Sequence, residues 1–162
     1  VPFIYYGEEI GMIGQKPDER IRTPMQWDDT NATAGFTTGR PWQPLQNNYD
    51  TVNVEDQSAD PNSLLNHYRN LIHTRANHTA LRTGEYVLVD SGGREVYSFL
   101  RYDDSEAILV VINMSNAPVS NYALTLESGG KATILAGGMD GTTAFGLLSD
   151  VSKVIGFKHK DY

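Results

Sequence analysis

The chain opens on an unbroken apolar and aromatic run, residues 1–6, which stops at Gly7 and is followed at once by Glu8 and Glu9. An apolar run without polar alternation is typical of a strand that is buried on both faces. Glycine lets the backbone turn sharply where a strand ends. In sheets and barrels of parallel strands, the carboxyl ends of the strands carry the ligand site. The opening therefore predicts a buried strand that ends beside such a site.

The rest of the chain divides into a loop, a helix and a series of strands. Residues 13–60 are rich in Pro, Gly, Asn, Asp, Thr and Gln and lack apolar periodicity, which predicts a long loop of the kind that is often functional. Asp60 and Pro61 then fit the N-cap and first position of a helix that ends near Asn77. One helix face carries the apolar residues Leu64, Leu65, Tyr68, Leu71 and Ile72.

From Gly84 onward the apolar period is that of strands. The predicted strands cover residues 85–90, 94–102, 106–114, 121–127, 131–136 and 153–157. The segment 107–112 is apolar on both faces and is expected to be the central strand. Short strands joined by tight turns predict an antiparallel sandwich. Residues 137–152 show no pattern that places them.

Composition excludes several classes of function. A net charge of −7 argues against a nucleic-acid or anionic-membrane partner, because both need clustered Lys and Arg. No run of about eighteen apolar residues is present, so we expect no transmembrane helix. The absence of cysteine rules out disulfides and thiolate metal sites. The spacing of the His residues predicts no metal site, and no Gly-rich phosphate loop is present, so no cofactor is expected. Cytoplasmic and secreted locations both remain open.

The opening residues and the segment after them resemble one enzyme family. Pro2, Ile4, Tyr5, Gly7 and Glu9 have the spacing of the eighth-strand motif of the α-amylase family of glycoside hydrolases. Residues 22–28 (Arg-Thr-Pro-Met-Gln-Trp-Asp), 34–37 and 41–42 are similar to the segment that follows in members acting on oligosaccharides. The resemblance continues through Asn53, Val54, Gln57, Ser63 and the helix to about residue 102.

The resemblance implies a fold and a division into domains. Residues 1–83 would form the last strand, loop and helix of a catalytic (β/α)8 barrel, and residues 84–162 a carboxyl-terminal antiparallel β-sandwich. The fold class is thus an α+β fragment. The family's three catalytic carboxylates lie on earlier strands, and no motif in this chain matches theirs. We therefore expect no catalytic residue here, and a parent enzyme that cleaves or transfers α-glucosidic bonds with retention.

Several residues are candidates for contact with substrate or for the structure of the motif. The resemblance places Arg22 at the mouth of the pocket, where a guanidinium donates to sugar hydroxyls or orients a carboxylate. Asp18 and Tyr6 are the other predicted contacts. The alternative for Asp18 is a solvated charge with no ligand, and the alternative for Tyr6 is a ring that fills the barrel. Pro2, Tyr5, Gly7 and Glu9 are predicted to be structural. Neighbours on an extended segment point opposite ways, so Glu8 and Glu9 are not expected to act as a catalytic pair.

Four aromatic residues of the long loop have two interpretations. Their irregular spacing is consistent with anchoring the loop to the barrel and with forming a platform for sugars, and anchoring is favoured. The four residues are Trp27, Phe36, Trp42 and Tyr49.

Two further hypotheses stay open for the whole chain. One is that residues 84–162 form a non-catalytic carbohydrate-binding or structural sandwich. Sugar binding usually needs a dense row of exposed Trp or Tyr along one strand face, and the sequence shows none there. The other is a separate subunit that docks with an amino-terminal barrel portion. The expected partners are an α-linked oligosaccharide, through the parent enzyme, and the missing amino-terminal part of the barrel. An unpaired strand over residues 1–6 is a liability, so residues 1–12 are predicted to be mispaired, exchanged between copies or docked on preceding chain.

Overall fold

The computed structural model describes residues 2–128, 131–139 and 144–148. The chain divides into two compact units, a first unit Val1–Thr74 and a second unit Arg75–Tyr162. This division falls inside the helix α3 (Leu64–Asn77). The domain boundary between residues 83 and 84 stays a prediction.

The apolar run at the start forms no strand in this chain alone. Residues 2–6 join no ladder among the described residues, and Phe3 is 94% exposed. A strand exists only through hydrogen bonds to a neighbouring strand, and the described part of the first unit contains none. The prediction of a buried strand is therefore wrong for the isolated chain. Glu8 and Glu9 follow in the short 3₁₀ helix η1 (Glu8–Ile10), rather than on the extended segment that we expected.

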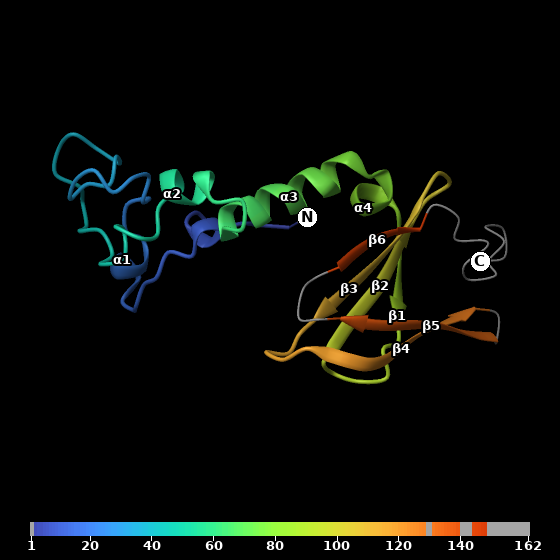
Figure 1. The fold of residues 1–162 in the computed structure, drawn as a ribbon. Helices are drawn as coiled ribbons and strands as arrows, with labels where there is room; N and C mark the ends of the chain where they lie inside the picture. Colours follow the sequence, from blue (N-terminus) through green and yellow to red (C-terminus); the bar gives the residue numbers. More distant parts are fainter. Residues whose placement is uncertain (1, 129–130, 140–143, 149–162) are drawn as a thin grey trace. The chain divides into compact units, whose positions relative to one another are not determined.

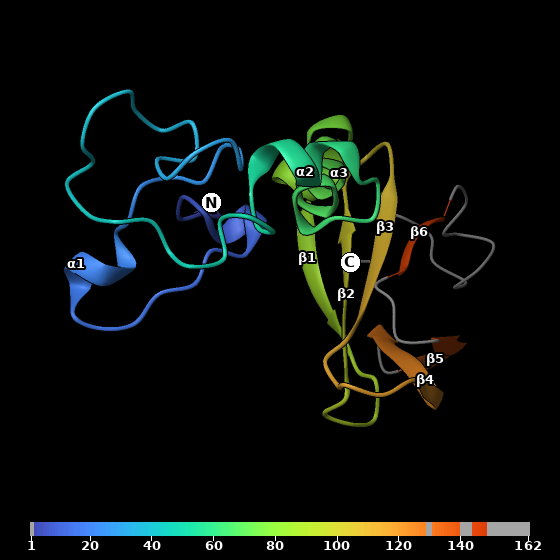
Figure 2. The ribbon, with the colours of Figure 1, turned by 60° about the vertical axis from the view of Figure 1, so that its left-hand side comes forward.

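The predicted long loop contains two short helices, α1 (Asp18–Ile21) and α2 (Val54–Ala59), which the sequence pattern did not indicate (Figure 2). The second forms because Asn53 caps it: its Oδ1 accepts a hydrogen bond from the Asp56 N–H at 2.8 Å. Asn53 is fully buried, and its Nδ2 donates to the Tyr49 carbonyl at 3.2 Å and to Asp56 Oδ2 at 2.8 Å. One side chain thus fixes the end of the loop and the start of the helix.

Helix α3 begins later than predicted and ends where predicted, at Asn77. Its N-terminal cap is Ser63, whose Oγ accepts from the Asn66 N–H at 3.1 Å. Asp60 instead ends α2 and accepts the Ser63 N–H on its carbonyl at 3.1 Å. The expected cap at Asp60 is therefore wrong, because a turn separates the two helices.

The core of the first unit gathers residues from three segments that lie far apart in the sequence. Ile10, Met25 and Leu65 are buried together, with Met12, Val52 and Val54 packed against them. The Val54 N–H donates to the Gln26 carbonyl at 3.0 Å, and the Glu55 N–H to the Trp27 carbonyl at 2.9 Å. Two parts of the long loop, at residues 26–27 and 54–55, are thereby paired. Gln26 itself is fully buried, and its Nε2 donates to the Val52 carbonyl.

The loop aromatics do not share this core. Trp27, Phe36 and Trp42 are 49%, 46% and 60% exposed, and Tyr49 is half-buried. Within this unit Ile10, Met25 and Leu65 fill the core instead. Anchoring of the loop to the barrel stays a prediction, because the described part of the first unit contains no barrel strand.

The second unit begins with the helix α4 (Thr79–Thr83), which was not expected, and continues as strands. The strands are β1 (Glu85–Val89), β2 (Val96–Tyr102), β3 (Ala107–Asn113), β4 (Val119–Ser128), β5 (Lys131–Met139) and β6 (Ala144–Leu148). One antiparallel sheet has the order β1-β2-β3-β6, and β4 and β5 form a separate antiparallel hairpin (Figure 1). The predicted order of helix followed by antiparallel β-structure is confirmed.

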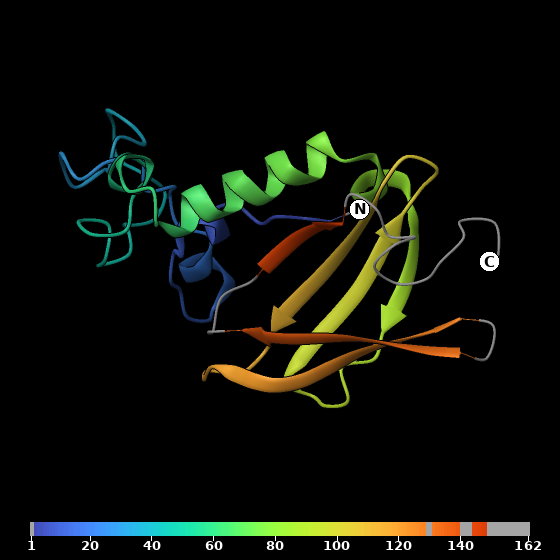
Figure 3. The ribbon, with the colours of Figure 1, turned by 45° about the vertical axis from the view of Figure 1, so that its right-hand side comes forward.

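Strand β3 lies between β2 and β6, and both of its faces are buried, as its apolar run predicted. Ala107 and Val111 point into a core shared with the hairpin β4–β5, which crosses one face of the sheet (Figure 3). Ile108 and Val110 point to the other face, where Ala80 and Leu81 of α4 pack on them. The alternation of β3 therefore places the four-stranded sheet between the hairpin and the helix.

The strands agree with the predicted ranges to within a few residues up to residue 136. The unplaced stretch 137–152 contributes the end of β5 and all of β6, which pairs with β3. Non-local pairing, rather than local pattern, makes this segment a strand. The strand predicted over residues 153–157 lies outside the described residues.

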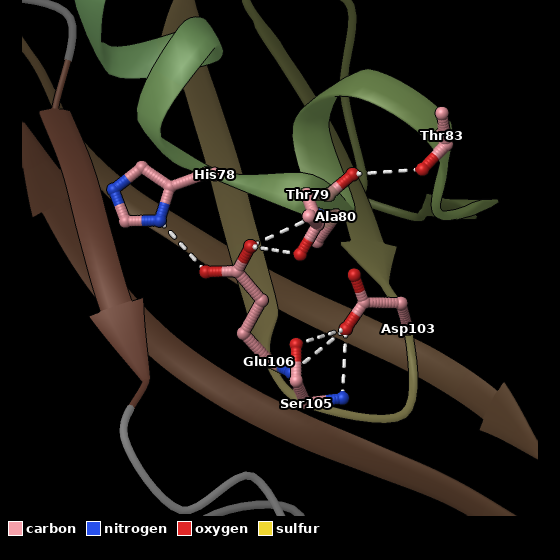
Figure 4. Close-up of polar contacts among 7 residues, drawn as sticks. All are labelled: His78, Thr79, Ala80, Thr83, Asp103, Ser105 and Glu106. Carbon is pink, nitrogen blue, oxygen red and sulfur yellow. Dashed lines mark hydrogen bonds and ion pairs between the residues drawn. The ribbon is translucent and has the colours of Figure 1, made fainter.

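A half-buried carboxylate connects α4 to the sheet. Glu106, just before β3, accepts from the Ala80 N–H at 2.9 Å, from Thr79 Oγ1 at 3.1 Å and from His78 Nδ1 at 2.7 Å (Figure 4). The hydrogen bond from the Ala80 backbone, then that from His78, lowers the pKa of Glu106. In the same turn Asp103 Oδ1 accepts from the Ser105 N–H at 2.7 Å and from the Glu106 N–H at 3.0 Å. Glu106 thus satisfies a backbone donor at the start of α4, and Asp103 satisfies two in the turn before β3, which are structural roles.

The cap at Asn53 gives the first prediction. Asn53→Ala removes the acceptor for the Asp56 N–H and both amide donors, so it should destabilise the first unit by about 1–3 kcal/mol. Urea denaturation measures the change, with Asn47→Ala, an exposed asparagine of the same loop, as the matched control. Equal midpoints for the two variants would contradict the role given to Asn53.

The second prediction concerns acid. Because the folded pKa of Glu106 lies below its ordinary value of 4.5, its stabilisation is present above that pH and is lost as the pH falls through the folded pKa. Glu106→Gln should lower stability by about 1 kcal/mol at pH 7 and should match the wild type once Glu106 is protonated. Urea midpoints across the acid range test this, with the exposed Glu95→Gln as control. An E106Q deficit that persists undiminished at the lowest pH would refute the linkage.

Candidate functional site

The three predicted contact residues lie close together in the first unit. Asp18 opens the one-turn helix α1, and Arg22 ends it. This spacing places their side chains on one face, where Arg22 Nη2 donates to Asp18 Oδ2 at 3.2 Å. The Lys16 ammonium also contacts Asp18. The short helix thus sets the position of both charges.

The ion pair leaves most of the guanidinium available. The side chains of Arg22 and Asp18 are 58% and 47% exposed, so solvent screens their attraction and the pair is worth about 0–1 kcal/mol. Among the described residues, Asp18 is the one hydrogen-bond acceptor recorded for the guanidinium. A guanidinium carries five N–H donors, so Arg22 keeps donors for a ligand.

Tyr6 contacts the backbone beside Arg22. Its Oη donates to the Thr23 carbonyl at 2.9 Å, and its ring lies 5.0 Å from that of Tyr5. Partial burial, then the neighbouring Tyr5, raises the pKa of Tyr6, and the positive charge of Arg22 partly offsets the rise. The phenol is therefore a neutral donor at pH 7. The ring is 43% exposed, which leaves part of it available for contact.

The predicted structural residues of the motif differ in what they do. Gly7 is buried at φ 85°, in the left-handed region, and an added Cβ would lie 2.5 Å from Met12 Sδ, so a side chain is excluded there. Pro2 and Tyr5 are exposed. Glu9 is half-buried, and its Oε2 makes no hydrogen bond among the described residues.

Within this chain, the carboxylate that holds the turn is Glu8. Glu8 Oε2 accepts from the Tyr5 N–H at 3.2 Å, and Oε1 accepts from Tyr68 Oη of α3 at 2.9 Å. This hydrogen bond raises the pKa of Tyr68. Sequence reasoning missed the role because it treated Glu8 and Glu9 as an extended pair, whereas the helical turn directs Glu8 toward α3.

The described residues hold no group of three or more His, Asp or Glu side chains arranged to bind a metal ion. Within the same part of the chain, no helix has the length and apolar character needed to cross a membrane.

Comparison with family models divides the chain into two matches. Residues 1–84 match the model of the α-amylase catalytic domain, and residues 86–144 match that of the α-amylase C-terminal all-beta domain. The helix α4 therefore belongs to the sequence matched by the catalytic domain.

Curated relatives match over most of this chain. An oligo-1,6-glucosidase of Parageobacillus thermoglucosidasius is 33% identical over 151 residues, which cover 70% of this chain and 27% of the relative. A glucan 1,6-alpha-glucosidase of Streptococcus pneumoniae is 33% identical over 135 residues, covering 83% of this chain and 24% of the relative. The chain thus spans about a quarter of the length of these relatives.

Solved structures agree with these matches. The trehalulose synthase MutB of Pseudomonas mesoacidophila is 42% identical with a TM-score of 0.58, covering 68% of this chain and 19% of that one. A MutB variant in complex with its substrate sucrose is 44% identical with a TM-score of 0.57, covering 67% of this chain and 19% of that one. On the sequence motif and the two family matches, the chain belongs to the α-amylase family of glycoside hydrolases.

Proposed function

We propose that this chain is the carboxyl-terminal part of a retaining enzyme that hydrolyses or transfers α-glucosidic bonds of malto- or isomalto-oligosaccharides. In this proposal the catalytic carboxylates lie on residues that precede the chain, and residues 84–162 form the β-sandwich domain after the barrel. The observation that carries it is that residues 1–84 match a catalytic domain, whereas the matched residues cover only 27% and 24% of the length of two curated relatives. The names of those relatives supply the α-linked substrate class.

The unmet contacts of the first unit support the same proposal. Residues 3–6 expose apolar and aromatic side chains that a neighbouring strand would cover. Glu9 Oε2, Thr23 Oγ1 and Gln26 Oε1 are buried without a hydrogen-bond partner among the described residues. Buried polar atoms in native proteins are nearly always hydrogen-bonded, so these three atoms fit a unit that docks on further chain.

Each candidate residue then has a definite task in the complete enzyme. Arg22 donates hydrogen bonds to sugar hydroxyls or to a catalytic carboxylate across the pocket mouth. Asp18 is a positioning residue that holds the guanidinium through the 3.2 Å ion pair. Tyr6 offers its exposed ring to a sugar face while its hydroxyl is fixed on Thr23.

The direct test compares two proteins. The chain of 162 residues alone should show no hydrolysis of maltose, isomaltose or nitrophenyl α-glucoside, whereas the longer protein with its native preceding residues should hydrolyse or transglycosylate at least one of them. Turnover by the highly purified 162-residue chain would refute the proposal, and so would a longer protein that is folded and inert on all α-glucosides.

The contact role of Arg22 gives a quantitative prediction. Arg22→Ala in the longer protein should lower kcat/KM by about 10- to 100-fold, the cost of one or two hydrogen bonds to a charged donor. The matched control is Arg40→Ala, because Arg40 is an exposed arginine of the same loop. Equal kcat/KM values for the two variants would remove Arg22 from the site.

Asp18→Asn separates positioning from direct contact. If Asp18 acts through Arg22, the variant should raise KM in the wild-type background and have no further effect when Arg22 is already alanine. Additive effects of the two substitutions would show that Asp18 acts independently.

A further inference from the structure

Arg22 lies at the border between a buried segment and an exposed one. The residues that follow it belong to the interior, since Thr23, Met25 and Gln26 are 4%, 8% and 0% exposed. The residues that precede it form α1, which buries no side chain and has no side-chain cap at its start. The core therefore fixes the backbone on one side of Arg22, and the other side depends on what holds α1.

The single turn of α1 does not hold its conformation in water through its own hydrogen bonds, because nucleation of a helix is unfavourable. Two backbone bonds close the turn: the Arg20 N–H donates to the Pro17 carbonyl at 2.9 Å, and the Arg22 N–H donates to the Asp18 carbonyl at 3.1 Å. The last carbonyl groups of a helix have no partner within it. In α1 the carbonyl of Arg20 is one of these groups.

The side chain of Gln46 supplies the donor that this carbonyl lacks. Its Nε2 donates to the Arg20 carbonyl at 2.6 Å, from a residue 26 positions further along the chain. Because the acceptor is a backbone group, the bond holds the path of the chain through α1 and not only one side chain. The guanidinium of Arg22 is attached two residues after this point, so a shift of α1 moves it.

Gln46 is in turn held by the core of the first unit. Two residues later, the Asn48 carbonyl accepts from the Val52 N–H at 2.8 Å, which closes a turn. Val52 packs against the core cluster, and its carbonyl accepts from the fully buried side chain of Gln26. The hydrogen bond from Gln46 therefore connects α1 to a fixed part of the loop.

We propose that Gln46 is a positioning residue for the substrate contact of Arg22. Through the Arg20 carbonyl it holds α1 in the place from which the guanidinium reaches the pocket. This inference rests on the proposed function, since it needs Arg22 to contact a sugar or a catalytic carboxylate. Asp18 sets the direction of the guanidinium on the helix face, whereas Gln46 sets the place of the helix itself.

Direct contact between Gln46 and the substrate is the alternative. The amide keeps its Oε1 and one N–H, and both groups can bind a sugar hydroxyl. The bond to Arg20 favours positioning, because it directs the amide nitrogen at the backbone of α1. The two roles differ in one measurable respect: positioning acts only through Arg22, whereas direct contact does not need Arg22.

A double-mutant cycle in the longer protein tests the proposal. Gln46→Leu, which keeps the approximate size of the side chain and removes its donor, should lower kcat/KM by about 3- to 10-fold, the worth of one neutral hydrogen bond. In an Arg22→Ala background the same substitution should have no further effect. Gln46→His, whose ring N–H reaches a similar position, should retain most of the activity.

The matched control is Gln43→Leu. Gln43 is a half-buried glutamine of the same loop, and its side chain has no recorded hydrogen bond among the described residues. This control should leave kcat/KM unchanged in both backgrounds. An equal loss from Gln46→Leu with and without Arg22 would overturn the proposal in favour of direct contact, and a loss no larger than that of Gln43→Leu would also overturn it.

Amide exchange measured by NMR in the 162-residue chain reports on α1 without catalysis. Gln46→Leu should speed exchange of the Arg22 N–H several-fold, because its acceptor, the Asp18 carbonyl, lies in the turn that loses its support. The Trp27 N–H, which donates to the Ala34 carbonyl at 2.9 Å elsewhere in the loop, should exchange as before. Unchanged exchange at Arg22, or an equal rise at Trp27, would refute a local role for Gln46.

The two proposals can fail separately. A longer protein that is active on α-glucosides, and in which Gln46→Leu is harmless, would refute the positioning role and leave the proposed function standing. An inert longer protein would refute the function and with it the effect of Gln46 on turnover, whereas amide exchange would still show whether Gln46 holds α1.

Discussion

The side chain of Gln57 is the interaction on which the first unit depends. Its Nε2 donates to the Ile10 carbonyl at 2.7 Å, and its Oε1 accepts from the Leu65 N–H at 3.0 Å. The amide therefore joins the turn after the opening run to the start of α3, over the core that Ile10 and Leu65 form. Because a primary amide both donates and accepts, neither a carboxylate nor an ammonium could make both contacts. Ordering a polar segment of this length costs conformational entropy, and the Gln57 bridge adds to the contacts of Gln26 and Asn53 that offset this cost.

This arrangement explains why the residues that carry the family resemblance differ in exposure. Gln26 and Asn53 are fully buried and bind backbone groups, so their side chains serve the fold of the loop. Arg22 belongs to the same motif but stays exposed, with one recorded acceptor among the described residues. A motif residue that the local fold does not need is the better candidate for contact with a substrate, and this contrast favours Arg22.

The sequence predicted the helix ending at Asn77 and the first five strands, because their apolar periods are local properties of the chain. It missed α2 and misplaced the cap of α3, since Asn53 was assigned to the loop and Ser63 to the helix interior, although both side chains accept from backbone N–H groups as caps. It could not place β6, which exists through pairing with β3. At the candidate site, Asp18, Arg22 and Tyr6 were predicted individually, but the anchor at Glu8 required knowledge of the turn that directs it to Tyr68.

The central claim is that this polypeptide forms the rim and support of a pocket whose nucleophile lies elsewhere. Trapping the longer protein with a mechanism-based fluoroglycosyl fluoride, followed by peptide mapping, tests this claim most directly, because a retaining enzyme holds the sugar on its nucleophile. The account predicts a single glycosyl adduct on a carboxylate that precedes residue 1 of this chain. An adduct on any Asp or Glu within residues 1–162 would contradict it.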